Sequence, residues 1–185
     1  MPMDLPGWVL EVFNLSLALG YWRQLGLAFL LGSFAVATWS DLKHLSAQRE
    51  FLEIWLAFLA GILTFDVYEA GVAGKIHWEV VAVKWGLIAV FSVLSLENVR
   101  LPYRFFRLAP ADVAALATAA SLLTPVLIVI FYLTAKLLSG VVRRLLQRGR
   151  PYYAFMPVVS LTTLAVLALG LVWQASVAAN ASAGR

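Results

Sequence analysis

The stretch WEVVAVKWGLIAVFSVLSL, residues 78–96, decides the fold class of this chain. Apart from two charged residues and two serines it is apolar, and apolar and polar positions do not alternate along it. A membrane-spanning helix needs about 20 mostly apolar residues, whereas a strand of a membrane barrel alternates with a period of two. The stretch therefore predicts a transmembrane helix.

Similar stretches lie on both sides of it. The chain is 62% hydrophobic and 13% charged, with a mean hydropathy of +0.86. Its 185 residues have room for about six spanning helices and for no separate soluble domain. We therefore predict an all-α, polytopic membrane helix bundle that forms one domain over residues 1–185. Besides 78–96, the expected spans are 24–40, 51–72, a short Ala-rich one at 109–124, 126–142 and 153–174.

The N-terminal region, residues 1–22, is apolar but interrupted by Glu11 and Asn14. We expect an interfacial helix here, or a lead-in to the first span, with Trp8, Tyr21 and Trp22 in an aromatic belt. The region has no basic start and carries acids, so it does not resemble a signal peptide.

Basic residues predict the orientation. Nine loop cations fall on one side of the expected spans and three on the other. Because cytoplasmic loops carry an excess of Lys and Arg, the richer side is predicted to be cytoplasmic and both termini outside. We expect a multi-pass protein of the cell membrane. The nine are Lys43, Arg49, Arg100, Arg104, Arg107, Arg143, Arg144, Arg148 and Arg150, and the three are Arg23, Lys75 and Arg185.

Composition also limits the chemistry. The chain has no Cys and only two His, His44 and His77, so thiol catalysis is excluded and we expect no metal site and no cofactor. The pI near 9.6 fits contact of the basic loops with anionic lipids. Nothing in the sequence predicts a nucleic-acid partner.

Two acids stand out at span ends on the predicted cytoplasmic side. Asp41 ends the first expected span, and Asp112 begins the fourth. An acid at a bilayer edge is costly and marks a candidate functional site. Two carboxylates within a few Å share one proton, so that one can activate water while the other polarises a carbonyl. We predict such a catalytic pair, without assigning which aspartate is acid and which is base.

Each of these residues also has a purely structural interpretation. An Asp at a helix end is often a cap, and Asp112 near a helix start complements the helix dipole. His44 is expected to be a solvated loop residue, with tuning of Asp41 as the alternative. Asp66 and Lys84 lie at similar depth near the outer side, where a structural ion pair is expected rather than a transport site. Lys136 is expected to extend towards the cytoplasmic surface.

Three stretches resemble one known family. LAPADVAALATAASLLTP, around Asp112, is similar to the second aspartate motif of type IV prepilin peptidases and archaeal preflagellin peptidases, which are GxGD intramembrane aspartyl proteases. SDLKHLSAQREFLEIW resembles the segment with the first catalytic aspartate, in whose place Asp41 stands. RPYYAFMPVVSLTTLAVL is similar to the Pro-rich opening of the last helix. The resemblance implies that Asp41 and Asp112 are the catalytic residues.

The chain departs from that family at two places. Ala109, Pro110 and Ala111 stand where the family has glycines before its second aspartate. The turn from His44 to Arg49, a few residues after Asp41, lacks the Pro that the family usually carries there. The cysteine-bearing domain and methyltransferase activity of the bacterial enzymes are absent, which fits the archaeal branch.

The resemblance implies an endopeptidase that removes the short basic leader of membrane-inserted pilin-like or archaellin precursors at the cytoplasmic face. Glu50, Glu53 and Glu97 lie on that side and are candidates for binding the leader, although each also fits a plain interfacial acid. Two alternatives remain open. One is a non-catalytic membrane scaffold, motivated by the Ala-Pro-Ala run, and the other is a small-solute carrier that uses Asp66 and Lys84.

Overall fold

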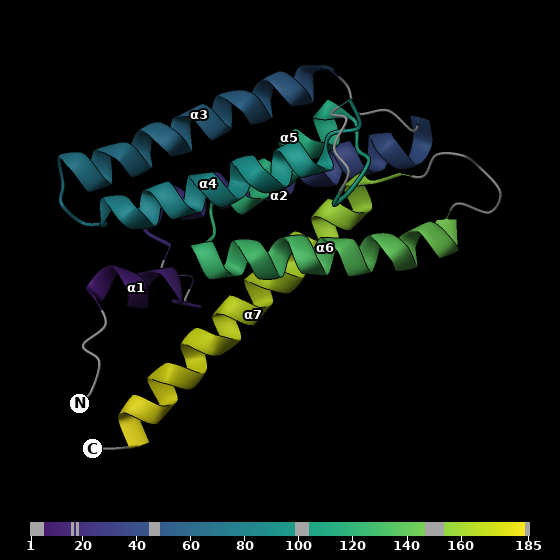
Figure 1. The fold of residues 1–185 in the computed structure, drawn as a ribbon. Coiled ribbons are helices and arrows are strands. Elements are labelled where there is room, and N and C mark those ends of the chain that lie inside the picture. Colours follow the sequence, from purple (N-terminus) through teal and green to yellow (C-terminus); the bar gives the residue numbers. More distant parts are fainter. Residues whose placement is uncertain are drawn as a thin grey trace.

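The computed structural model describes residues 6–15, 17, 19–44, 49–98, 104–146 and 154–183. In these ranges the chain is helical and carries no strand, as predicted. The helices run antiparallel to their chain neighbours over most of the bundle (Figure 1). They are α1 (Gly7–Val12), α2 (Tyr21–His44), α3 (Arg49–Gly71), α4 (Trp78–Ser95), α5 (Pro110–Ala120), α6 (Pro125–Leu146) and α7 (Met156–Ala183).

Five of these helices, α2, α3, α4, α6 and α7, are long and apolar enough to cross a membrane. Many of their large apolar side chains are exposed, as expected for surfaces that face lipid. The chain is therefore a multi-pass membrane protein. The prediction of a sixth span was wrong, because the 11 residues of α5 reach only about 16 Å at 1.5 Å per residue, half of a 30 Å core.

Helix α5 nevertheless turns the chain back. It begins at the end of the bundle where α2 and α4 finish, and α6 then runs in the direction of α4 (Figure 1). We call this the aspartate end, because it holds Asp41 and Asp112. Helix α1 lies near the start of α4 at the opposite end, and the last turns of α7 extend away from the bundle in that direction (Figure 1).

Two helix boundaries differ from expectation. Helix α2 continues through His44, so Asp41 lies inside its last turns rather than after its end. In the described part of the N-terminal region, α1 covers six residues and α2 begins at Tyr21. Tyr21 and Trp22 are exposed where α2 begins, as an aromatic belt requires.

Helix α5 lies inside the bundle, as its composition predicts. Every residue from 113 to 120 is buried. Its Ala side chains let neighbouring helices approach closely, and Thr118 Oγ1 donates to the Ala114 carbonyl at 2.6 Å within the helix. Small residues also predict close packing of this helix against the first span, α2, but its main neighbours are α3, α4 and α7. Trp55 of α3 is fully buried, and its ring makes a T-shaped contact with the ring of Phe34, so that it fills the space between α3 and α2.

A buried ion network joins three helices near the opposite end. Asp66 of α3 is 1% exposed. Its Oδ2 accepts from Lys84 Nζ of α4 at 2.6 Å and from Trp85 Nε1 at 2.9 Å. Its Oδ1 accepts from Arg23 Nη2 of α2 at 2.8 Å, and the same Nη2 lies 2.6 Å from Glu69 Oε2. The predicted Asp66–Lys84 ion pair is confirmed, with Arg23 and Glu69 as partners that the sequence did not reveal.

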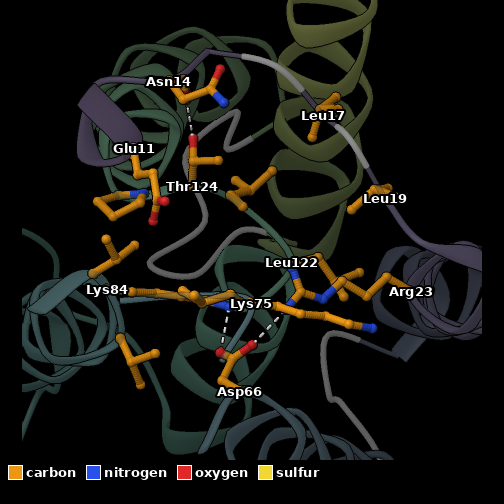
Figure 2. A pocket seen from close by; sticks show the side chains of 15 residues that line it. Glu11, Asn14, Leu17, Leu19, Arg23, Asp66, Lys75, Lys84, Leu122 and Thr124 are labelled. Atoms are coloured by element: carbon orange, nitrogen blue, oxygen red, sulfur yellow. Dashed lines mark hydrogen bonds and ion pairs between the residues drawn. The ribbon is translucent and has the colours of Figure 1, made fainter. Parts of the chain in front are cut away.

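Above this network lies a cavity of about 300 Å³. Figure 2 shows Asp66, Arg23 and Lys84 on one side of it, with Glu11 and Thr124 on the other. Residues 122–125, which follow α5, also line it, so the cavity occupies space that a full-length fourth span would fill. The N-terminal segment covers it, and Thr124 Oγ1 donates to the Asn14 carbonyl at 2.6 Å.

The ion network gives a test of what holds α2, α3 and α4 together. Asp66→Asn keeps the size of the side chain but leaves Lys84 without its carboxylate partner, so the free energy of unfolding should fall by about 3–5 kcal/mol. The measurement is unfolding of the purified protein in detergent, followed by tryptophan fluorescence. The double variant Asp66→Leu/Lys84→Leu removes both charges and should lose less than Asp66→Asn alone. Equal losses in the two variants would contradict the network's role.

Candidate functional site

Asp41 lies in the last turns of α2 and is 6% exposed. Its Oδ2 accepts a hydrogen bond from the backbone N–H of Met156 at 2.9 Å, and the backbone of Phe155 supplies a second hydrogen bond. Met156 is the first residue of α7. The first N–H groups of a helix have no partner within it and carry the positive end of the helix dipole. Asp41 therefore satisfies the start of a helix from another part of the chain.

A second polar contact lies one helical turn away. Thr38 of α2 and Ser160 of α7 form a hydroxyl–hydroxyl hydrogen bond of 2.8 Å. Thr38 and Asp41 lie on one face of α2 because residues three apart are neighbours on a helix. The two contacts together fix how α2 and α7 pack at the aspartate end.

Asp112 lies in the first turn of α5 and is half-buried. Pro110 starts that helix, where a missing N–H costs nothing. Ala109 occupies the cap position in an extended conformation and has no side-chain oxygen to cap the helix. Asp112 can thus interact with the positive end of the α5 dipole, as its structural interpretation predicts.

The segment before α5 brings Glu97 into this region. After α4 ends at Ser95, the chain returns so that residues 104–108 run beside the end of α4. Leu108 N–H donates to the Ser95 carbonyl at 3.0 Å, and Glu97 N–H donates to the Leu108 carbonyl at 3.1 Å. Glu97 is therefore held a short distance from the start of α5.

The charges of this region act on Asp112. Burial, together with the negative charges of Asp41 and then Glu97, raises the pKa of the Asp112 carboxyl to about 7. The two predicted aspartates, on different helices, are thus close enough for the charge of one to change the ionisation of the other. Near neutral pH, Asp112 exists in both protonation states.

The other predicted residues are less closely connected with the pair. Glu50 and Glu53 are exposed in the first turns of α3 at the same end of the bundle. The side chain of His44 lies outside the described residues. Lys136 of α6 donates to the carbonyl of Phe105 and so extends towards the aspartate end, as predicted. Within the described ranges, no group of three or more His, Cys, Asp or Glu side chains could hold a metal ion.

Sequence reasoning missed the contribution of Phe155 and Met156. Their N–H groups contact Asp41, although Met156 lies 115 positions away from Asp41 in the sequence. The available signal was the Pro157 that follows the start of α7, since a Pro in a first turn marks a helix N-terminus with N–H groups that need acceptors.

Comparison of the chain with protein-family models, with curated proteins and with solved structures gives no match.

The raised pKa of Asp112 can be tested by stability. The unfolded carboxyl titrates near pH 4 and the folded one near 7, so between these values the folded state holds more protons. The contribution of this group to the free energy of unfolding must then fall as the pH rises from about 4 to about 7. Asp112→Asn should flatten this part of the dependence of melting temperature on pH in detergent.

Glu50→Gln, which removes an exposed acid at the same end, is the control and should leave the pH dependence unchanged. If wild type and Asp112→Asn show the same dependence between pH 4 and 7, the environment assigned to Asp112 is wrong.

Proposed function

We propose that this chain is a membrane aspartyl endopeptidase whose catalytic pair is Asp41 and Asp112. The observation that supports it is the electrostatic coupling between these two carboxyls at one end of the bundle. Like charges that share a site retain one proton between them. A pair in that state offers one group that accepts a proton and one that donates a proton at the same pH.

The surroundings of the two acids favour one assignment of roles. Asp41 meets backbone N–H groups at the start of α7, which stabilise negative charge. The carboxyl of Asp112 is partly removed from water and lies near two negative charges, and both effects favour its protonated form. In the proposed reaction Asp41 is the base and Asp112 the acid.

The steps balance with these two groups alone. A water molecule attacks the carbonyl carbon of the scissile peptide bond while Asp41 takes one of its protons. Asp112 gives its proton to the carbonyl oxygen, which forms a neutral tetrahedral intermediate. When the C–N bond breaks, the proton held by Asp41 goes to the leaving nitrogen, and the intermediate returns a hydroxyl proton to Asp112.

The substrates proposed are membrane-inserted pilin-like or archaellin precursors with a short basic leader. This rests on the family resemblance of the segments around Asp41 and Asp112. Two properties of the aspartate end support it. Glu50, Glu53 and Glu97 are exposed there and attract a basic leader, and α2 to α7 provide apolar surfaces along which the following helix of a precursor can lie.

A second candidate is a non-catalytic membrane scaffold. The contact that favours it is the bond from Met156 N–H to Asp41, because it gives Asp41 a structural role that needs no chemistry. Under this alternative, Asp41 is kept for the packing of α2 on α7, and wild type cleaves no precursor.

Substitution of the two acids separates these functions. Asp41→Asn and Asp112→Asn should each lower precursor cleavage by at least about 10²-fold, since Asn cannot exchange a proton. Asn can still accept the Met156 N–H bond, so both variants should fold. The double variant should be no worse than either single one, because residues that act as a unit are not additive. The assay is the gel shift of a pilin-like precursor in detergent.

Asp66→Asn is the matched control, as it removes a buried acid from the other end of the bundle. It should keep the cleavage rate per folded molecule. Near-wild-type cleavage by either Asp41→Asn or Asp112→Asn would refute the catalytic pair, and an inactive wild type with folded protein would favour the scaffold.

The pH profile tests the roles assigned to the pair. Because ionised Asp112 cannot donate a proton, kcat should fall as the pH rises through about 7. Glu97→Gln removes one of the charges that raise the pKa of Asp112, so the alkaline limb of kcat should move to lower pH. Glu50→Gln should leave the limb in place. A limb that does not move in Glu97→Gln would contradict the assignment of Asp112 as the acid.

A further inference from the structure

A second cavity lies at the aspartate end, between the segment of residues 104–108 and helix α6. Its volume is about 370 Å³. Of the eight described residues that line it, four are cations, namely Arg104, Arg107, Lys136 and Arg143, and none of these eight is acidic. The proposed catalytic pair does not line this cavity, so it is a separate feature of the molecule. We call it the basic pocket.

The segment side of the pocket is held in place by backbone hydrogen bonds. Phe105 N–H donates to the Leu94 carbonyl at 2.9 Å, and Leu108 N–H donates to the Ser95 carbonyl at 3.0 Å. Arg104 Nη1 reaches the carbonyl of Glu97 at 3.3 Å, which leaves its other N–H groups available. The basic side chains therefore project from a backbone that is fixed to α4.

Helix α6 supplies the other wall. Lys136 and Arg143 lie on one face of it, two turns apart. Lys136 Nζ donates to the Phe105 carbonyl and lies 4.9 Å from the centre of the Phe106 ring. Only one of its three N–H groups is needed for that bond. Both walls of the pocket thus carry cations.

Such a group of cations favours the binding of an anion. Several like charges on one cavity repel one another, and an anion with several oxygens relieves this repulsion. Guanidinium groups match phosphate oxygens in geometry and charge, and Lys adds a point charge. The chemistry of the pocket therefore fits a phosphate group.

The position of the pocket indicates where that phosphate comes from. Beside the face of α6 with Lys136 and Arg143 runs an apolar strip of Leu133, Leu137 and Val141, which are 50%, 74% and 53% exposed. This strip extends from the depth of the pocket towards the middle of a candidate membrane span. A phospholipid carries both parts, a phosphate that fits the pocket and acyl chains that fit the apolar strip.

We infer that the basic pocket between residues 104–108 and α6 binds the phosphate headgroup of an anionic phospholipid, whose acyl chains lie along α6. An anionic headgroup is selected because four cations face it without any acid in the lining. A zwitterionic headgroup would place its own positive charge among them. The site does not depend on the proposed peptidase function.

Native mass spectrometry of the full chain in detergent tests this inference. The delipidated protein is offered an equimolar mixture of phosphatidylglycerol and phosphatidylcholine. Wild type should retain phosphatidylglycerol preferentially. Arg107→Gln/Arg143→Gln, two exposed residues of the pocket, should lower this preference by roughly tenfold or more, given the free energy that each basic residue contributes near an anionic surface.

The matched control is Lys43→Gln/Arg144→Gln, which removes two exposed cations from the same end of the bundle outside the pocket. It should keep the preference of wild type. A conservative variant, Arg107→Lys/Arg143→Lys, keeps the charges and should retain most of it, which separates loss of binding from loss of folding.

Three results would overturn the inference. The first is equal retention of the two lipids by wild type. The second is an equal loss of preference in the pocket variant and the control, which would indicate general attraction by surface charge. The third is displacement of the lipid by inorganic phosphate or glycerol phosphate at equal concentration, which would assign the pocket to a soluble phosphate compound.

Discussion

Helix α5 is enclosed by longer helices yet has only 11 residues, and the arrangement of the whole bundle depends on it. Its Ala-rich surface allows α3, α4 and α7 to pack closely around it. Because it begins at the aspartate end, it brings Asp112 into the electrostatic reach of Asp41. Because it stops about halfway along its neighbours, it leaves the cavity above Asp66 that the N-terminal segment covers. Residues 104–108 return along the end of α4 and form one wall of the basic pocket. The same segment leads the chain to the first residue of α5.

The partners of the charged side chains differ between the two ends of the bundle. At the opposite end, Asp66 meets Lys84 and Arg23, and Arg23 also meets Glu69, so acids and bases neutralise one another. This network of paired charges joins three helices. At the aspartate end, Asp41 and Asp112 are coupled as like charges, and four cations of that end line a separate pocket. A pair of acids without a base between them retains a proton, which is why we place the proposed chemistry there and a structural role at Asp66.

The sequence predicted the elements whose signals are local. Apolar runs of sufficient length predicted all five spans, and the small residues of 113–120 predicted a buried helix. Similar depth in neighbouring spans predicted the Asp66–Lys84 pair. The position of Asp112 in a first turn followed from Pro110, and its shared end with Asp41 followed from the distribution of basic residues in the loops.

What the sequence did not predict depends on packing between distant segments. The length of α5 was overestimated because residues 121–124 are apolar enough to continue a helix, yet the chain turns there. Its main neighbour α3 could not be deduced, since an Ala surface fits any helix equally well. Arg23 joins the ion network from the first turn of α2, and the register that allows this is set by the packing of α2 on α3. The contact of Asp41 with Met156 depends on how α7 returns to α2, whereas Pro157 marks only where α7 begins and not which residue its N–H groups meet.

Asp41 has a structural contact and a proposed chemical role, and these are compatible. An ionised carboxylate has about four acceptor positions, and the backbone groups of Met156 and Phe155 use two of them. The remaining positions can accept a proton from water. The same contacts make the pair asymmetric, because Asp41 accepts hydrogen bonds at the positive end of α7 whereas Asp112 lies near the negative charges of Asp41 and Glu97. Two identical side chains in environments that separate their proton affinities are what acid–base catalysis requires. The bond that orients α7 would thus also determine which aspartate holds the proton.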